Sequence, residues 1–207
     1  MEQSLLDKSN ERSEKTGVRS IPTDEELIIR FQNGDVYAFE QIVHRYKDPL
    51  INFVYHFLGS RIDAEDVIQE TFLRVFKNKH LYRNIAKFST WIYTIAGNLA
   101  KTELRRRRRR KLLSLSHMGY QDKDYDLPDL FSSPERTVDG EMKGQMIQKE
   151  IEDLPVKFRE VVVLRDIQEF SYEEISEILH IPIGTVKSRV NRGRIRLQKR
   201  LQHLLDK

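Results

Sequence analysis

Apolar residues recur every three or four positions through most of this chain, and this spacing predicts amphipathic α-helices. Thr23 and Glu26 match a T-x-x-E capping box, which predicts the start of a first helix that ends at Asn33. Asp35 caps a second helix, which we expect to run to Gly59. Its buried stripe is predicted at Phe39, Ile42, Val43, Tyr46, Leu50, Phe53, Val54 and Phe57.

The same periodicity continues in a third helix over about 63–77 and a fourth over about 89–111. Short connections between these four helices predict one compact N-terminal domain over 23–111. Residues 1–22 are polar and have no periodic pattern, and we interpret them as a disordered N-terminal tail.

Periodicity is absent from 112–137, a stretch that is acidic and contains two prolines, and we interpret it as a linker. Helical spacing resumes at 138 and restarts at Pro155, which predicts a second small helical domain over 138–207. No strand pattern or internal repeat competes with this interpretation. The predicted fold class is therefore all-α, with two small helical domains joined by an acidic flexible linker.

The C-terminal end of the chain has the spacing of a helix-turn-helix motif. Ser171 and Glu174 match a second capping box that begins a short helix, and residues 180–183 then turn the chain. The last helix has an apolar stripe, in which Gly193 predicts close packing, and an outer polar face with Thr185, Lys187, Ser188, Asn191 and Arg192. Such a face can enter a DNA major groove and bond to base edges. The alternative is an ordinary solvated amphipathic helix.

Composition restricts where such a protein can act. The 207 residues include no Cys, which excludes disulfides and thiolate metal sites and suits a reducing cytosol. No apolar run approaches the ~18 residues of a membrane span, and the first residues lack the apolar core of a signal peptide. We therefore expect a soluble, cytoplasmic protein with no membrane insertion of its own.

Charge is distributed unevenly, although the net charge is only +4. Residues 112–154 contain ten acids and four bases, a net −6, whereas residues 185–207 contain eight bases and one acid, a net +7. A run of six arginines over 105–110 forms a second basic block. Nucleic-acid phosphates contact local patches of positive charge, so the distribution of charge matters more than its total. The two basic blocks therefore predict contact with nucleic acid.

The predicted helix over 63–77 has an informative outer face. Leu73 lies at its centre, surrounded by Asp66, Gln69, Glu70 and Arg74. A leucine ringed by acids and an amide, on a protein whose other faces are basic, predicts a docking surface for a basic protein partner. One alternative is ordinary surface scatter, since a lone exposed leucine is common. Another is a metal site formed by Asp63 with two of these acids, which no histidine joins.

The segment over 88–111 joins aromatic residues directly to the arginine run. A continuous polar strip beside Trp91 is predicted at Thr94, Asn98, Lys101 and Arg105. Aromatic rings at Tyr82, Phe88 and Trp91, beside an amide and cations, suit the binding of unstacked bases of a single strand. The arginines suit the adjacent phosphates. The alternative assigns Phe88, Trp91 and Tyr93 to the hydrophobic core.

Four stretches together carry a family resemblance: AFEQIVHRYKDPLINFVYHFLG, DAEDVIQETFLRVFKN, FSTWIYTIAGNLAKTELRR and LPVKFREVVVLRDIQEFSYEEISEILHIPIGTVKSRVNRGR. In this order and spacing they are specific, and the chain resembles the extracytoplasmic-function (ECF) sigma factors. These are the small two-domain group of the sigma-70 family of bacterial RNA polymerase sigma factors. The resemblance covers about 24–205, and it implies that the two domains correspond to sigma regions 2 and 4. The tail before Thr23 and the long arginine run depart from the family pattern.

The resemblance implies a transcription initiation factor that directs core RNA polymerase to promoters and helps to melt them without ATP. It implies that the helix over 63–77 docks on the clamp helices of the largest polymerase subunit. It further implies that the segment from Tyr82 to Arg105 opens and reads the minus-ten element, where Asn98 contacts a flipped base. The last helix then reads the minus-thirty-five element, with contact candidates at Thr185, Lys187, Ser188, Arg189, Asn191 and Arg192.

The resemblance also implies further partners. The C-terminal domain would contact the flap of the second-largest polymerase subunit, the acidic linker would pass near the RNA exit path, and an anti-sigma factor would hold the protein inactive. We expect no catalytic residues, no metal and no cofactor, and hence no enzyme. One alternative is a conventional helix-turn-helix regulator acting on duplex DNA alone, and another is a metal-dependent nuclease with clustered carboxylates and histidines.

Overall fold

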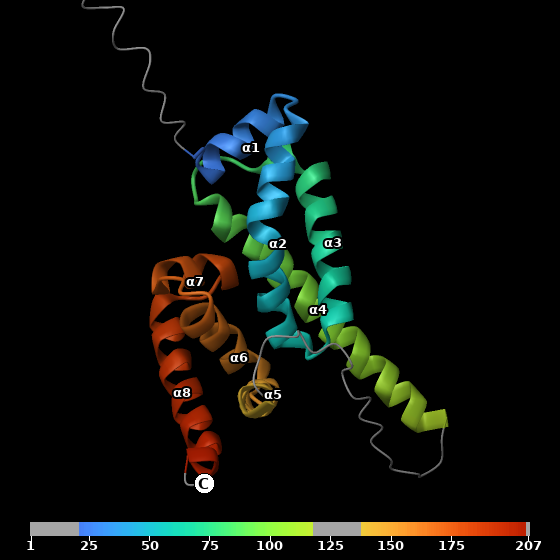
Figure 1. Ribbon diagram of the computed structural model, residues 1–207, viewed down its shortest axis with the longest axis vertical. Helices are drawn as coiled ribbons and strands as arrows, with labels where there is room; N and C mark the ends of the chain where they lie inside the picture. The colour runs from blue at the N-terminus through green and yellow to red at the C-terminus, as the bar shows by residue number, and fades with distance from the viewer. Residues whose placement is uncertain (1–20, 118–137, 206–207) are drawn as a thin grey trace, which may run out of the picture.

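The computed structural model describes residues 21–117 and 138–205, and every regular element within these ranges is helical. The N-terminal unit, residues 21–117, contains α1 (Asp24–Gln32), α2 (Val36–Leu58), α3 (Arg61–Lys77), a short 3-10 turn (Lys79–Leu81) and α4 (Phe88–His117). The C-terminal unit, residues 138–205, contains α5 (Val138–Glu152), α6 (Val156–Val162), a π-helical turn (Val163–Ile167), α7 (Tyr172–Leu179) and α8 (Ile183–Leu205). Figure 1 shows the two units side by side, and the predicted all-α fold class is confirmed.

Short polar side chains fix the helix starts where the sequence predicts them. Thr23 Oγ1 accepts from the backbone N–H of Glu26 at 3.2 Å, while the Glu26 carboxylate accepts from the Thr23 N–H at 2.8 Å. Ser171 and Glu174 form the same reciprocal pair at the start of α7, at 3.1 and 2.8 Å. At the other end of α2, Gly59 adopts φ 68°, a left-handed conformation that glycine adopts without steric cost. Both predicted capping boxes are therefore confirmed.

The helix α4 is longer than the sequence analysis predicts. It has 30 residues and ends at His117, so the end predicted at Lys111 is wrong. Between that lysine and Gly119 the sequence contains no Gly or Pro, and its three Leu residues favour helix, so the sequence has no helix-breaking residue before His117. Glu25 caps its start by accepting from the Phe88 N–H at 3.0 Å. Residues 118–137 of the predicted linker and 1–20 of the predicted tail lie outside the described residues.

The helix α2 forms the centre of the N-terminal unit, with α1, α3 and α4 packed around it. Its buried side chains include Phe53 and Phe57, whose rings lie 5.0 Å apart, and Phe53 also packs 5.1 Å from the ring of Tyr93 in α4. Burying each such aromatic side chain contributes about 1.5–3 kcal/mol to folding. The buried stripe of α2 therefore holds α4 in place.

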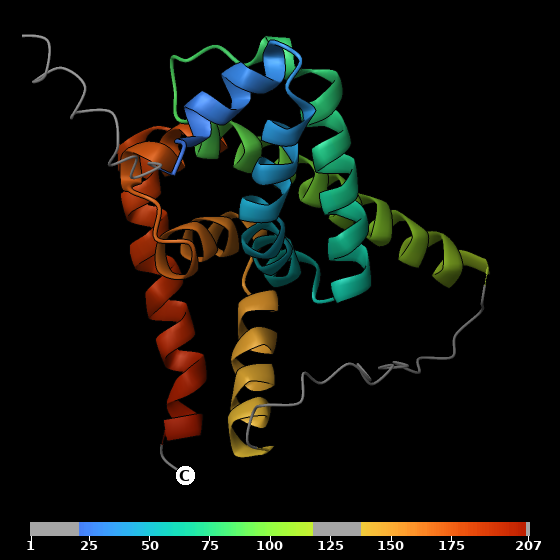
Figure 2. The same ribbon diagram turned by 45° about the horizontal axis from the view of Figure 1, so that its top comes forward.

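Close approach of α6 to α8 shapes the C-terminal unit. A Cβ atom added to Gly193 would lie 2.5 Å from a methyl carbon of Val162, so the two helices can pack this closely only with glycine at that position. This confirms the close packing predicted from the sequence. In Figure 2, α5 and the second half of α8 project in the same direction, where Arg200 Nε lies 2.7 Å from a carboxylate oxygen of Glu150.

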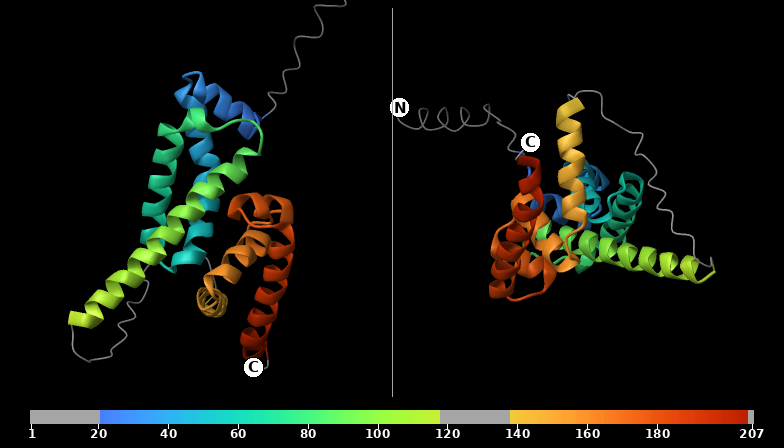
Figure 3. Two further views of the ribbon diagram at one scale, coloured as in Figure 1. Left: turned by 180° about the vertical axis from the view of Figure 1, so that it is seen from behind. Right: turned by 90° about the horizontal axis from the view of Figure 1, so that it is seen from below.

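The two units pack directly against each other. The C-terminal unit lies beside the first half of α4, with α7 against that helix and α5 against α2 (Figure 3). The rings of Tyr93 and Phe170 meet edge to face across this interface, with centroids 4.7 Å apart. No helix within the described ranges is long and apolar enough to cross a membrane.

Candidate polymerase and nucleic-acid interfaces

One face of α3 carries all five residues predicted for polymerase docking. Leu73 is 52% exposed, and the residues around it are also exposed: Asp66, Gln69, Glu70 and Arg74. Glu70 accepts from Arg74 Nε at 2.8 Å, an i,i+4 ion pair that supports the helix. The opposite side of α3 is anchored in the core by buried Val67 and Thr71. We call the five exposed residues the docking face.

The polar residues predicted on α4 lie in one row along the helix. Asn98 and Arg105 are exposed, whereas Thr94 and Lys101 are half-buried. The Thr94 hydroxyl donates to the backbone carbonyl of Thr90 at 2.8 Å, which fixes its orientation. We call Thr94, Asn98, Lys101 and Arg105 the single-strand strip.

The aromatic rings beside the strip differ from the prediction. Tyr82 is 5% exposed and Phe88 is fully buried, and their rings pack 5.6 Å apart. Because a base can stack only on an accessible ring, this burial contradicts the predicted stacking role of these two residues. Trp91 is half-buried, and its ring lies 5.5 Å from Tyr82 and 5.9 Å from Phe88. The two buried rings therefore position the tryptophan, while Tyr93 belongs to the core.

A polar network holds the segment between α3 and α4. The Tyr82 hydroxyl donates to the backbone carbonyl of Ala86 at 2.9 Å, which fixes the turn before α4. Tyr46 packs on Phe88 at 5.5 Å and donates to Asp24 in α1. Burial, together with the neighbouring Asp24 carboxylate, raises the pKa of Tyr46 far above its ordinary value, so the phenol stays protonated. The start of α4 is therefore held rigidly by α1 and α2.

The arginine run is divided between internal and outward-facing side chains. Arg107 donates to the backbone carbonyl of Leu58 at 2.7 Å and pairs with Asp63, so it satisfies the carboxyl end of α2. Two other arginines of the run, Arg106 and Arg110, each lie 2.9 Å from a Glu103 oxygen. The i,i+3 spacing of Glu103 and Arg106, and the i,i+4 spacing of Glu103 and Arg107, are helical pairing signals that the sequence analysis did not use. At least three cations of the run are thus occupied within the chain.

The outer face of α8 presents the residues predicted to read duplex DNA. The exposed ones are Lys187, Ser188, Asn191 and Arg192, while Thr185 is half-buried. Arg189 is also half-buried, and its Nη1 lies 3.2 Å from the Glu160 carboxylate. His180 ends α7 with φ 54°, and Ser176 Oγ donates to the Ile181 carbonyl at 2.6 Å, which closes the tight turn. We call the six predicted residues of α8 the duplex-reading face.

Two basic side chains flank an aromatic ring at the start of α7, a feature that the sequence analysis missed. The Arg165 guanidinium carbon lies 4.8 Å from the centroid of the Tyr172 ring, and Lys187 Nζ lies 5.9 Å from it. Arg165 also donates to the Phe170 carbonyl at 2.8 Å. The ring thus places Arg165 beside Lys187 of the duplex-reading face, where both cations can meet backbone phosphates. No cluster of metal-ligating side chains occurs among the residues that the structure describes.

Comparisons with known proteins agree with this arrangement. The family descriptions "Sigma-70 region 2" and "Sigma-70, region 4" match residues 42–110 and 144–197. The ECF RNA polymerase sigma factor SigW of Bacillus subtilis is 38% identical, over 86% of this chain and 96% of that protein. The RNA polymerase sigma-H factor of Pseudomonas aeruginosa is 33% identical, over 88% of this chain and 95% of that protein.

Among solved structures, the sigma factor RpoE of Bartonella quintana, in complex with the anti-sigma factor NepR, is similar with a TM-score of 0.61. That match has 25% identity and covers 79% of this chain and 96% of that one. The chain has two helical units, and the second contains a helix-turn-helix formed by α7 and α8. Together with these matches, this architecture defines a sigma factor of bacterial RNA polymerase. The chain belongs to the ECF group of the sigma-70 family.

Proposed function

We propose that this chain binds core RNA polymerase through the docking face, and that it recognises promoters with the duplex-reading face and opens them with the single-strand strip. One observation carries the proposal: within one four-helix unit, α3 exposes the Leu73 face while a second helix, α4, exposes Asn98 and Arg105 of the strip. A regulator that acts on duplex DNA alone needs neither surface. Both surfaces are needed by a factor that holds a polymerase and an unpaired strand together.

The docking face suits a basic helical partner, and we assign it to the clamp helices of the largest polymerase subunit. Leu73 supplies an apolar anchor that a partner can desolvate, while the acids around it supply a polar rim. Glu70 already pairs with Arg74 on this face. We therefore assign the main contact with a basic partner to the exposed carboxylate of Asp66.

Promoter opening is assigned to the single-strand strip. Extruding a base from the duplex costs a few kcal/mol, which new hydrogen bonds and stacking must offset. The exposed amide of Asn98 can hydrogen-bond to the edge of a flipped base. The half-buried ring of Trp91, on the same helix, offers a surface on which a base can stack. Arg105 can then hold the adjacent phosphate. The chain supplies this melting by binding alone, and no step requires ATP.

Recognition of the minus-thirty-five element is assigned to the duplex-reading face. Lys187, Asn191 and Arg192 are exposed on one side of α8, where a helix can enter the major groove. The C-terminal unit also supplies the surface that we assign to the flap of the second-largest subunit. The protein therefore acts with RNA polymerase, in the cytoplasm.

An anti-sigma factor is a further proposed partner. The Bartonella quintana sigma factor is held in a complex with such a protein. For this chain, we infer an inhibitor that covers the docking face, because covering Leu73 blocks polymerase and leaves the fold intact.

Transcription with purified components tests the proposed function. The protein is mixed with sigma-free core polymerase and a pool of genomic fragments, and the transcripts are sequenced. Discrete start sites that share two upstream elements are expected. Tight binding to duplex fragments, with no binding to polymerase and no transcripts, would instead establish the conventional regulator.

A further inference from the structure

The helix α1 lies along the segment that joins α3 to α4, at one end of the N-terminal unit (Figure 1). We call residues 79–87 of this segment the connection. The structure describes all of these residues, and among them only the side chain of Tyr82 is buried. A segment with so little buried surface opens locally at a low free energy unless other contacts hold it. The conformation of the connection therefore depends on the groups that bond to its backbone.

Gln32, at the end of α1, holds the first part of the connection. Its Nε2 donates to the Lys79 carbonyl at 2.7 Å and to the Tyr82 carbonyl at 3.0 Å. In the opposite direction, Lys79 Nζ donates to the Phe31 carbonyl at 2.8 Å and lies 4.2 Å from the centroid of the Phe31 ring. The ammonium group thus satisfies a carbonyl in the last turn of α1, where the helix dipole favours a cation. Three hydrogen bonds therefore join the end of α1 to the start of the connection.

Glu25, in the first turn of α1, holds the other end of the connection. Its carboxylate accepts at 3.0 Å from the N–H of Phe88, the first residue of α4, and its charge suits the positive end of the helix dipole. An ion pair between Lys87 and Glu174 of α7 also reaches the connection, but Lys87 is exposed and solvent screens it. Glu25 and Gln32 are two helical turns apart, about 10 Å along the axis, so they lie on the same face of α1. The helix therefore holds both ends of the connection from one face.

The residues that α1 holds are also those that contact Trp91. Tyr82 and Phe88 pack their rings against the tryptophan, with centroids 5.5 and 5.9 Å from it. Trp91 is half-buried, and it lies on the same line along α4 as Asn98, two helical turns later. A shift of the connection would move both supporting rings and would change how the tryptophan faces a base beside Asn98. The position of Trp91 is thus linked to α1 through Tyr82 and Phe88.

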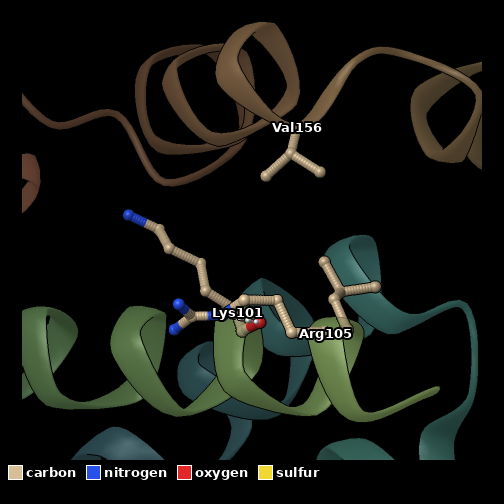
Figure 4. Close-up of a pocket in the computed structure, with 4 residues that line it drawn as sticks. Lys101, Arg105 and Val156 are labelled. Carbon is tan, nitrogen blue, oxygen red and sulfur yellow. Dashed lines mark hydrogen bonds between the residues drawn. The ribbon is translucent and has the colours of Figure 1, made fainter. Parts of the chain in front are cut away.

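The other end of the single-strand strip lies far from α1. Lys101 and Arg105 line a cavity of about 310 Å³ with Val156 of α6 on its other side (Figure 4). Arg105 lies roughly 25 Å along α4 from Phe88. A change in α1 should therefore alter the contact of Trp91 with a base while leaving these two cations in place.

We propose that α1 belongs to the promoter-opening apparatus, and that Gln32 and Glu25 are positioning residues that hold the connection in the conformation in which Trp91 can stack on an unpaired base. The inference rests on the proposed function of the single-strand strip. The match to sigma region 2 begins at residue 42, so α1 lies outside the matched residues. Because α1 orders the connection before a strand arrives, binding of the strand does not have to order it. Neither positioning residue needs to touch DNA.

Amide hydrogen exchange of the isolated full chain tests whether α1 holds the connection. Gln32→Leu keeps most of the side-chain volume and removes both donated hydrogen bonds. The hydrogen-bonded amides of Leu81 and Tyr82 are expected to exchange about tenfold faster, while amides in the middle of α2 change less than about twofold. Arg30→Ala is the matched control on α1, because Arg30 bonds to Asp35 and not to the connection. It should leave the exchange of these amides unchanged.

Fluorescence of Trp91 provides a second measurement, since it is the single tryptophan of the sequence. Loss of either contact with α1 should expose the ring further and shift its emission to longer wavelength. The shift is expected in Gln32→Leu and in Glu25→Ala, and Arg30→Ala should emit as the wild-type protein does.

Promoter opening tests the positioning role in the complex with core polymerase, on a promoter found by the transcription experiment. Glu25→Ala is expected to reduce opening, followed by permanganate reactivity, by about five- to tenfold. Glu25→Gln keeps an oxygen that can accept from the Phe88 N–H, so its opening should stay within about twofold of wild type. Both variants should bind polymerase and duplex DNA normally. The salt slope of binding to a pre-melted promoter should also be unchanged, because the cations of the strip are unaffected.

The outcomes separate this inference from the proposed function. Unchanged exchange and emission in Gln32→Leu and Glu25→Ala would show that α1 does not hold the connection. Faster exchange with wild-type opening, or equal defects in Glu25→Ala and Glu25→Gln, would overturn the positioning role while leaving the proposed function intact. A wild-type protein that binds polymerase and opens no promoter overturns the proposed function, and the exchange rates then still decide whether α1 holds the connection.

Discussion

The two DNA-reading helices differ in how freely they present their polar residues. The duplex-reading face of α8 is open to solvent at Lys187, Asn191 and Arg192, on a motif fixed by its own capping box and tight turn. The strip of α4 instead lies next to the C-terminal unit, with Lys101 already paired to Glu160. The three exposed residues of α8 are therefore free of the interface between the units, whereas the ammonium group of Lys101 is held by the C-terminal unit.

This contrast follows the chemistry of each target. Duplex DNA offers its groove and phosphates at any time, so an exposed helix can search for it. An unpaired strand exists only after the polymerase has engaged the promoter, and until then the pairing of Lys101 with Glu160 leaves the strip one cation fewer for other nucleic acids. The docking face on α3 is also exposed in this arrangement of the two units.

The largest effect is expected at the docking face, because the single-strand strip and the duplex-reading face both act only on a polymerase-bound protein. Leu73→Arg places a charge at the centre of an apolar contact and is expected to weaken polymerase binding by more than about 50-fold. The measurement is a titration of labelled protein with core polymerase. Tyr37→Arg, at an exposed aromatic on α2, is the control and should bind normally. Unchanged affinity in Leu73→Arg would remove the docking assignment.

Asn98→Ala is expected to damage the single-strand reader alone. Loss of the base contact should reduce promoter opening by about tenfold or more, while binding of duplex promoter stays within about twofold. Permanganate reactivity of unpaired thymines reports opening, and a gel shift reports duplex binding. Equal losses on duplex DNA and on a promoter with a pre-melted bubble would count against the assigned role.

Asn191→Ala, the matching change in α8, should have the reverse effect. A lost base-edge contact costs about 1–3 kcal/mol of specific binding. Binding to duplex promoter is expected to weaken accordingly, while transcription from a pre-melted template falls much less. The comparison between the two helices fails if Asn98→Ala and Asn191→Ala give the same pattern.

The arginine run also contains one residue bonded within the chain, Arg107, and one exposed residue, Arg109. Arg107→Ala leaves the end of α2 without its donor and should lower the free energy of unfolding by about 1–2 kcal/mol in urea titrations. Arg109 is exposed, so Arg109→Ala should leave stability unchanged. If Arg109 contacts a phosphate, this change should lower the salt slope of single-strand binding by about 0.7. Equal stability of the two variants would show that Arg107 has no structural role.

The smallest expected effect concerns pH. Burial lowers the pKa of His56 below its ordinary value of 6.5, while a hydrogen bond with Gln148 of the C-terminal unit opposes this shift. The unfolded chain then takes up the proton first, so stability is complete above the ordinary pKa and falls as pH decreases through the lowered one. Between about pH 7.5 and pH 6 we expect a loss below about 1 kcal/mol, measured by thermal unfolding. His56→Gln should flatten this dependence, and an unchanged slope would assign it to other groups.

The sequence predicts local structure well where one side chain decides it. Thr23, Ser171 and Gly193 act on neighbours within a turn or a single helix contact, so their types are sufficient signals. The exposed position of Leu73 follows from helical periodicity in the same way. The end of α4 is predicted wrongly because apolar periodicity is lost after the arginines, although the helix continues to His117.

These local patterns do not predict contacts between segments that are far apart in the sequence. Nothing local distinguishes a fully buried Phe88 from a half-buried Trp91, since both are aromatics on the same helical stretch. Glu160 belongs to no motif, and it pairs with Lys101 and Arg189 only because α4 and α8 both approach α6. The packing of the two units depends on surfaces far apart in the sequence, which periodicity does not relate.

Chemical labelling of lysines tests most directly whether the single-strand strip is less accessible than the duplex-reading face. The isolated protein is treated with a limiting amount of an amine-reactive reagent, and the modification rates of Lys101 and Lys187 are followed by mass spectrometry. We expect Lys101 to react several-fold more slowly than Lys187, because Glu160 holds its ammonium group in the interface. Glu160→Gln should bring the two rates together. Equal rates in the wild-type chain would contradict the account, since the strip of α4 would then be as open as the face of α8.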